Sequence, residues 1–247
     1  MPVMIKKTWA VLIIVCLTVS GCTTLYRTSP DFEKAYKEAK TVAVMPLDVN
    51  VYLLKAGNTR ELIDEWSQEA QGNIAKSLQR HLGEEQKYKV KFIDLSWLKS
   101  QNEQLWVDNR ALYEAVAGMA VMTSLPKENA LFPTKRAAFD YTLGAQAAEL
   151  GRLCDADLLL FVNGYDHDST LGRMALGFFN ATVMAVLTGS YYIPINPSSL
   201  SMSLVNAKTG NLEWFKISPA ESEYEFRNEQ GMDYLIQWML KELRPKK

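Results

Sequence analysis

Two carboxylates flank a histidine near the middle of the chain, in Asp166-His167-Asp168. Residues i and i+2 of a strand share a face, so both carboxylates could contact one cation. Adjacent acids that follow a strand are more often a solvated loop, and no further ligand group is evident nearby. The chain has only two histidines and three cysteines, which nearly excludes a zinc site built from these ligands. We therefore expect neither a metal nor a cofactor.

Nucleophilic catalysis finds little support in the sequence. Cys154 precedes an apolar run at residues 157–162, and His81 and His167 are the only imidazoles that could activate it, so a buried, inert thiol is the preferred interpretation. There is no Gly-x-Ser-x-Gly elbow and no phosphate-binding loop that ends in Gly-Lys-Ser/Thr. Glu221 and Glu223 are a pair of a kind too common to indicate sugar cleavage. We expect a protein that is not an enzyme.

The N-terminal residues have the three-part organisation of a secretory signal peptide. Lys6 and Lys7 precede an apolar run at residues 10–19, and small residues lead from it to Cys22. The apolar part is too short to span about 30 Å of hydrocarbon. Its ending, Val-Ser-Gly-Cys22, resembles the lipobox of bacterial lipoproteins. The resemblance implies that residues 1–21 are removed and that Cys22 is acylated and held by membrane lipid.

The residue after Cys22 adds a destination to this interpretation. It is Thr23, and the resemblance implies that lipoproteins without aspartate at this position are sorted to the periplasmic face of the outer membrane. We interpret residues 22–30 as the lipidated cysteine with a short polar linker. Eight extended residues reach about 27 Å, so residues 31–247 should form a domain close to the membrane.

Composition is typical of a folded domain. Hydrophobic residues make up 48% of the chain and aromatic residues 11%, which supports a packed core. A formal net charge of −1 gives no basic footprint for nucleic acid. Loss of Cys16 with the signal peptide and acylation of Cys22 would leave Cys154 alone, so we expect no internal disulfide.

The hydrophobic pattern predicts an α/β fold: a single domain with a mixed sheet, helices packed on it, and a C-terminal antiparallel hairpin followed by a helix. Expected strands cover residues 41–47 (buried on both faces), 88–92 (half exposed), 157–162 (central), 199–204 (buried on one face) and 212–217, with a turn at 206–211. Expected helices cover residues 31–40, 62–82 after a capping box at 58–61, 96–124 as one or two helices with a cap at Asp108, 135–150 ended by Gly151, and 232–243.

One long stretch, between Arg173 and Lys208, carries no charge. Within it, four small residues recur at every fourth position and would stack on one side of a helix: Gly177, Ala181, Ala185 and Gly189. Three interpretations are open: a buried helix that covers the sheet, a surface for self-association or a partner, and a membrane-inserted segment. We favour burial and retain the four residues as a candidate interaction surface.

Three segments together carry a further resemblance. Residues 42–47 resemble the first strand, residues 150–160 the helix-to-strand step, and residues 204–214 the final hairpin of a periplasmic α/β fold. That fold occurs in the curli secretion lipoprotein CsgG, the penicillin-binding-protein activator LpoB and the N-terminal domain of TolB. The chain is also similar to uncharacterised proteobacterial lipoproteins, through runs at residues 133–135, 139–140, 143–144 and 172–176.

This chain lacks the long linker of LpoB and offers only one uncharged segment where CsgG needs two barrel hairpins. The resemblance therefore implies the fold and a non-catalytic character. We expect a protein of the cell envelope that acts in interaction or assembly, with an envelope protein as partner. The alternative is a component of a secretion or lipid-transport complex that forms homo-oligomers through residues 174–195.

Overall fold

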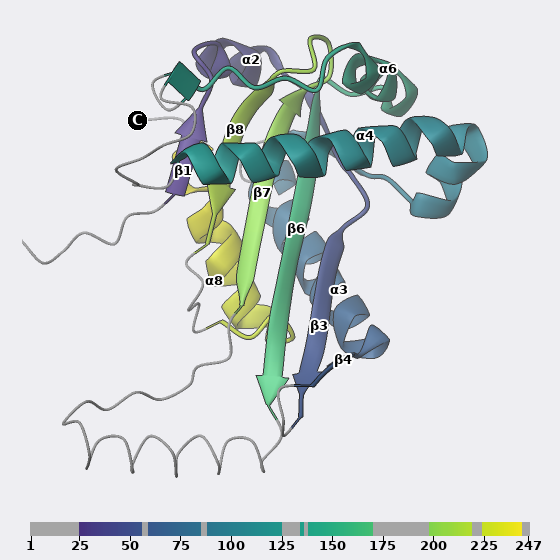
Figure 1. Cartoon of the computed structure of the whole chain (residues 1–247), viewed down its shortest axis with the longest axis vertical. Helices are drawn as coiled ribbons and strands as arrows, with labels where there is room; N and C mark the ends of the chain where they lie inside the picture. The colour runs from purple at the N-terminus through teal and green to yellow at the C-terminus, as the bar shows by residue number, and fades with distance from the viewer. Residues whose placement is uncertain are drawn as a thin grey trace, which may run out of the picture.

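A computed structural model of the chain describes residues 25–55, 59–84, 88–124, 134–135, 138–169, 198–218 and 224–243. Within these ranges it shows one mixed sheet with helices on both faces, as Figure 1 shows. The strands are β1 (Leu25–Thr28), β2 (Thr41–Val44), β3 (Asp48–Leu54), β4 (Arg60–Leu62), β5 (Lys89–Phe92), β6 (Leu158–Ser169), β7 (Ser199–Asn206) and β8 (Leu212–Ile217). The helices are α2 (Phe32–Glu38), α3 (Asp64–Leu78), α4 (Leu95–Ser124), α6 (Ala145–Cys154) and α8 (Glu229–Met239).

The sheet is built around β6, as the apolar run at residues 157–162 predicts. The strand order is β1-β8-β7-β6-β2-β5. Strands β2 and β3 lie one after the other along the same edge of β6, both parallel to it, and β7 is antiparallel on the other edge. Pro46 lies in the short break between β2 and β3, where no ladder hydrogen bond is lost. The predicted mixed α/β fold is confirmed.

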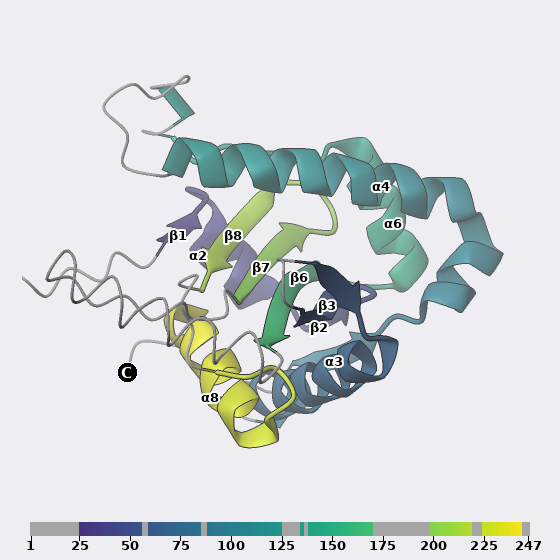
Figure 2. The same cartoon turned by 60° about the horizontal axis from the view of Figure 1, so that its bottom comes forward.

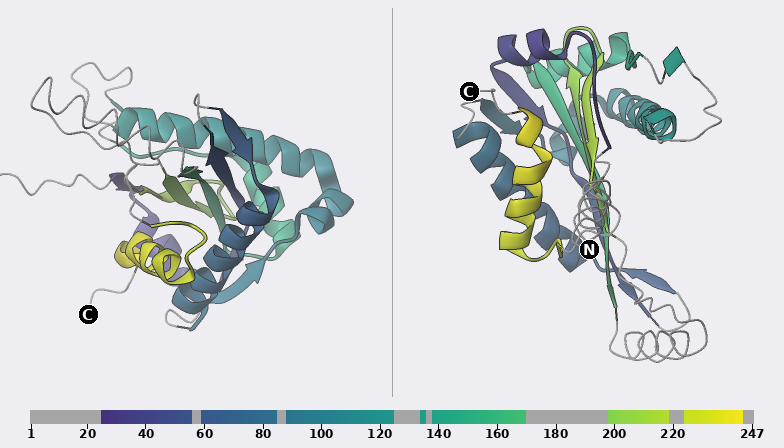
Figure 3. Two further views of the ribbon diagram at one scale, coloured as in Figure 1. Left: turned by 90° about the horizontal axis from the view of Figure 1, so that it is seen from below. Right: turned by 90° about the vertical axis from the view of Figure 1, so that its left-hand side faces the viewer.

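Two hydrophobic cores lie on opposite faces of the sheet, because alternate residues of each strand point to opposite sides. In β6, Leu158 and Leu160 join the core under α3 and α8, whereas Leu159 and Phe161 join the core under α4 and α6. The right-hand view of Figure 3 shows this three-layer arrangement edge-on. In Figure 2, α4 passes over β8, β7 and β6 on one side while α3 and α8 lie on the other.

The first strand differs from the sequence expectation. Residues 23–30 were expected to be a polar linker, yet Leu25–Thr28 form β1, which pairs antiparallel with β8. The next residue continues this contact, since the Ser29 N–H donates to the Glu213 carbonyl at 2.8 Å. Only Thr23 and Thr24 therefore separate Cys22 from a hydrogen-bonded strand.

The predicted helix over residues 62–82 begins too early. The expected capping box falls where Arg60–Leu62 pair with β3 as β4, and α3 starts at Asp64 without a side-chain cap. At its other end the helix does not stop at Gly83, because Gln79–Glu84 add a π-helical turn with His81 and Leu82 buried. The apolar residues of α3 nevertheless fill the core as the periodicity predicts.

Helix α4 confirms the prediction of one or two helices but breaks at a different place. Asn102 has φ −162° and ψ 90°, and its side chain accepts from the Leu105 N–H at 3.0 Å, so it caps the second part. The predicted cap at Asp108 is wrong, since Asp108 lies inside the helix and accepts from Gln104 at 2.7 Å. The first part is capped by Asp94, which accepts from the Trp97 N–H.

The predicted helix over residues 135–150 is wrong in its position. Residues 138–144 lie outside the helices, with Thr142 bridged to Asn211, and α6 begins at Ala145 and runs to Cys154. Gly151 lies inside this helix and does not end it. Asp155 takes the left-handed conformation that closes the helix, with φ 46°.

The C-terminal half follows the prediction closely. Strands β7 and β8 form the expected hairpin, with Gly210 at φ +75° in its turn, and α8 buries one apolar face before a short 3₁₀ turn at Lys241–Leu243. One detail is wrong: β7 is covered on both faces, where the alternation at residues 199–204 predicted burial on one. Across the described ranges, the helices lack the combination of length and apolar character that crossing a bilayer requires.

Candidate functional site

The acidic pair singled out in the sequence lies within β6, not in a solvated loop. Alternation places Asp166 and Asp168 on the face that carries α3 and α8, and His167 on the opposite face. The Asp166 carboxylate is buried and accepts from the backbone N–H of Phe226 and of His167, both at 2.9 Å. Burial raises the pKa of Asp166, although the two backbone hydrogen bonds oppose the shift.

Asp168 has a different partner. Its carboxylate pairs with Arg227, whose guanidinium also lies 4.1 Å from the centre of the Trp66 ring. Both acids thus hold the segment that leads into α8, where Phe226 is fully buried. Among the described residues, His, Cys, Asp and Glu side chains do not gather in groups of three that could hold a metal ion.

Substitution of Asp166 by alanine is expected to lower the free energy of unfolding by about 1–3 kcal/mol, because the buried Phe226 N–H loses its acceptor. The same change at Asp168 removes a half-exposed ion pair and should cost less than about 1 kcal/mol. Urea unfolding of both variants measures the difference. Equal losses at the two positions would contradict the assignment of Asp166 as the buried anchor.

The remaining sequence candidates divide into one that the structure places and several that it does not. Cys154 is buried, as predicted, and burial raises its pKa to about 11, which keeps the thiol protonated at neutral pH. Cys22 and the four small residues Gly177, Ala181, Ala185 and Gly189 lie outside the described residues. Their proposed roles stay predictions.

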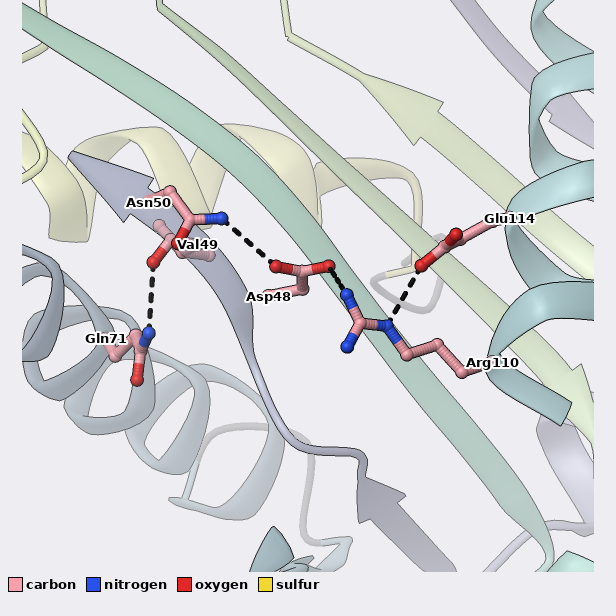
Figure 4. A network of polar contacts seen from close by, with 6 residues as sticks. All are labelled: Asp48, Val49, Asn50, Gln71, Arg110 and Glu114. Atoms are coloured by element: carbon pink, nitrogen blue, oxygen red, sulfur yellow. Dashed lines mark hydrogen bonds and ion pairs between the residues drawn. The ribbon is translucent and has the colours of Figure 1, made fainter. Parts of the chain in front are cut away.

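Sequence reasoning missed a polar network at the start of β3, drawn in Figure 4. The Asp48 carboxylate accepts from Asn50 at 3.1 Å and from the Arg110 guanidinium at 2.7 Å, and Arg110 also donates to Glu114 at 2.9 Å. Residues i and i+4 on α4 are neighbours, which aligns Arg110 with Glu114. The network therefore joins α4 to the strand that begins after the break at Pro46.

The same strand is also tied to the helix on the other face. The Gln71 amide donates to the Val49 carbonyl at 3.0 Å, and the Val51 N–H donates to the Ser67 hydroxyl at 3.0 Å. The outer edge of β3 would otherwise present unpaired backbone groups. Side chains of α3 satisfy them, so β3 is protected from pairing with another chain over this length.

A second missed feature is a surface that we call the distal polar face. It is formed by the α4-side residues of β3, β6 and β7 near the ends of β3 and β6, where in Figure 1 these strands extend past α4. His167 stacks on Tyr52 with ring centres 5.4 Å apart and meets Tyr165 edge-on at 5.3 Å. Its members are Asn50, Tyr52, Asn163, Tyr165, His167, Ser199 and Ser201, of which His167 and Ser199 are buried.

The chemistry of the distal polar face is that of a contact surface. Amides, hydroxyls and aromatic rings supply hydrogen-bond donors and acceptors around flat apolar patches. Tyr165, with 40% of its surface exposed, is the most accessible ring of the cluster. Alternating hydrophobicity could not reveal this face, because its residues come from three strands that are distant in sequence.

Comparisons with known proteins leave the family open. No family model and no curated protein matches the chain. Among solved structures, the chain is similar to the PelC dodecamer from Paraburkholderia phytofirmans, with 12% identity and a TM-score of 0.37 over 91% of this chain and 99% of that chain. It is also similar to lipoprotein GNA1162 from Neisseria meningitidis, with 12% identity and a TM-score of 0.32 over 82% and 96% of the two chains. The resemblance to the fold of CsgG, LpoB and TolB stays a prediction.

Proposed function

We propose that the protein is a lipoprotein of the cell envelope, anchored through acylated Cys22 at the periplasmic face of the outer membrane, with a non-catalytic role in interaction or assembly. The observation that carries the proposal is the Gly21-Cys22 pair at the end of an apolar signal segment. Two or three acyl chains on one cysteine would hold the domain firmly, since each buried CH₂ contributes about 0.8 kcal/mol.

The described structure supports this role through the kind of surfaces it presents. The distal polar face offers hydrogen-bonding groups around the exposed Tyr165 ring, and the buried Cys154 thiol is held in its unreactive form. Asp166 and Asp168, which were considered as metal ligands, hold the chain in place before α8. Glu221 and Glu223 lie outside the described residues. A partner protein at the distal polar face would contact its hydrogen-bonding groups in the arrangement that the structure shows.

Substitution of Cys22 by alanine is expected to remove the protein from the membrane fraction, because the acyl chains are then absent. Fractionation of cells that express the full chain, with density-gradient separation of inner and outer membranes, measures this. The mass of the N-terminal peptide should show the loss of residues 1–21 and the added lipid. Unchanged membrane association of Cys22→Ala, or an unprocessed N-terminus, would refute the proposal.

A second function, an oligomerising component of a secretion or lipid-transport complex, is favoured by one observation. Phe92, Leu95 and Trp97 expose 42%, 40% and 39% of their surfaces within six residues, beside β5, which is a terminal strand in the sheet order. Apolar residues beside an open strand are typical of an association surface. The mass of the detergent-solubilised full chain decides between a monomer and a homo-oligomer.

A further inference from the structure

The position of β1 sets how far the folded domain can lie from its proposed anchor. Three Cα–Cα steps separate Cys22 from Leu25, which is the first residue of β1, and each step spans 3.8 Å at most, so the two residues lie within about 11 Å of each other. Tyr26 is one step further, within about 15 Å of Cys22. The headgroup layer on each side of a bilayer is about 5–8 Å thick. A lipidated Cys22 therefore keeps β1 at or beside the headgroups.

The side chains around β1 suit that location. Tyr26 exposes 40% of its surface and lies opposite Lys216 in the antiparallel pair, so both side chains share the face that carries α8. The Lys216 ammonium lies 3.9 Å from the centre of the Trp238 ring, which brings the half-buried Trp238 to the same place. Tyrosine and tryptophan are the residues enriched at membrane–water interfaces.

The opposite face of β1 adds an apolar side chain. The C-terminal end of α4 lies beside β1, as Figures 1 and 2 both show. Met122, in the last turn of α4, exposes 56% of its surface. We call Tyr26, Met122 and Trp238 the anchor-side surface.

The charges near Trp238 also favour a position at the lipid headgroups. Beyond Trp238, four of the last seven residues of the chain are lysine or arginine, beginning with the exposed Lys241. The one acid among these seven, Glu242, is already paired with the buried Lys216. Lysine and arginine residues that follow Trp238 so closely in the sequence are complementary to a bilayer with anionic headgroups.

We infer that the anchor-side surface rests on the bilayer, with Tyr26 and Met122 in the headgroup layer. The inference rests on the proposed acylation of Cys22. It also limits the depth of insertion, because the outer edge of β1 carries backbone groups that need water or polar partners and cannot enter the hydrocarbon core. The domain thus stands on the membrane by the β1 edge of its sheet, with β5 farthest away.

A pair of matched positions tests this orientation. Tyr26 and Phe92 have similar exposure, 40% and 42%, and lie on the two terminal strands of the sheet order. Five strand spacings separate β1 from β5, which is about 24 Å. The variants Tyr26→Cys, Met122→Cys and Phe92→Cys would each carry one environment-sensitive fluorophore, because the native Cys154 is buried and the proposed acylation occupies Cys22.

The lipidated full-length variants are reconstituted in phosphatidylethanolamine–phosphatidylglycerol vesicles, with doxyl-labelled lipids as quenchers. Quenching at residues 26 and 122 should exceed that at residue 92 by about twofold or more, and a doxyl group near the headgroup should quench more than one near the chain end. Met122→Cys keeps the test decisive if the change in β1 disturbs folding.

Each other outcome refutes the inference in a different way. Equal, weak quenching at all three positions in protein that floats with the vesicles overturns the orientation and leaves the lipid anchor intact. Protection of residue 26 from iodide without quenching by doxyl lipids shows that a protein covers this surface. Failure of the protein to float with the vesicles overturns both the inference and the proposed acylation.

Discussion

Replacement of Gly151 by alanine is expected to destabilise the fold by about 1–3 kcal/mol, although alanine is the better helix former by about 1 kcal/mol. Gly151 lies inside α6, where the helix meets the end of β7. A Cβ atom there would lie 2.5 Å from both the Cβ and the carbonyl oxygen of Ala207, and 2.9 Å from its Cα. These are mostly backbone atoms, so no side-chain rotation can relieve the overlap.

Gly72 supplies the control, because it also lies inside a helix, α3. A Cβ atom at Gly72 meets nothing within 4 Å. Gly72→Ala should therefore raise the free energy of unfolding by about 0.5–1 kcal/mol through helix propensity alone. Denaturant unfolding of the two variants gives opposite shifts of the midpoint. A Gly151→Ala protein as stable as Gly72→Ala would show that α6 does not approach β7 as closely as described.

The second large effect is expected at Lys216, whose side chain is 1% exposed. Its ammonium donates to the Trp238 carbonyl at 2.7 Å and to the Glu242 carboxylate at 2.5 Å. Lys216→Ala removes three buried methylene groups as well as these bonds and should cost about 3 kcal/mol. Lys216→Met retains most of the apolar stem and leaves the partly exposed Glu242 carboxylate to water, so we expect a smaller loss of about 1–2 kcal/mol.

The two Lys216 variants also differ from the wild type in their pH dependence. Burial lowers the pKa of Lys216, and pairing with Glu242 opposes the shift only in part. Between the folded and unfolded pKa values the unfolded chain binds more protons, so this group makes stability rise with pH in that alkaline window. The stability deficit of Lys216→Met relative to the wild type should therefore widen as the pH is raised through this window. A gap that stays constant with pH would show that folding does not lower the pKa of Lys216.

Much of the fold could be predicted because its core elements carry strong local patterns. The continuous apolar run that ends at Val162 predicts a strand covered on both faces. The spacing of apolar residues in α8 predicts a helix with one buried side. The hairpin turn at Gly210 was marked by its composition. In these segments local preference and tertiary burial agree.

The errors occur where pairing between distant strands decides the structure. No local pattern marks Leu25–Thr28 as a strand, because four residues with one charge are equally typical of a linker. Pairing with β8 makes them a strand. Arg60–Leu62 likewise follow β3, although their sequence fits a helix start. A single sequence does not show which distant strands will pair.

The candidate site was predicted less well for a related reason. Asp166 was visible as an acid, but its role depends on the Phe226 N–H, sixty residues later in the chain. The distal polar face requires the register of three strands before its residues meet. Arg110 and Asp48 are separated by 62 residues and meet only because α4 crosses the sheet.

The pairing of β1 with β8 also has a consequence for the order of folding steps. Ribosomes make β1 first among the strands and β8 last, so the residues next to Cys22 can find their partner only after Ile217 has been made. Until then Leu25–Thr28 lack their partner strand, and the loop that must close to pair them spans most of the chain. Closure of this edge should be a late step in folding, after the hairpin of β7 and β8 has formed.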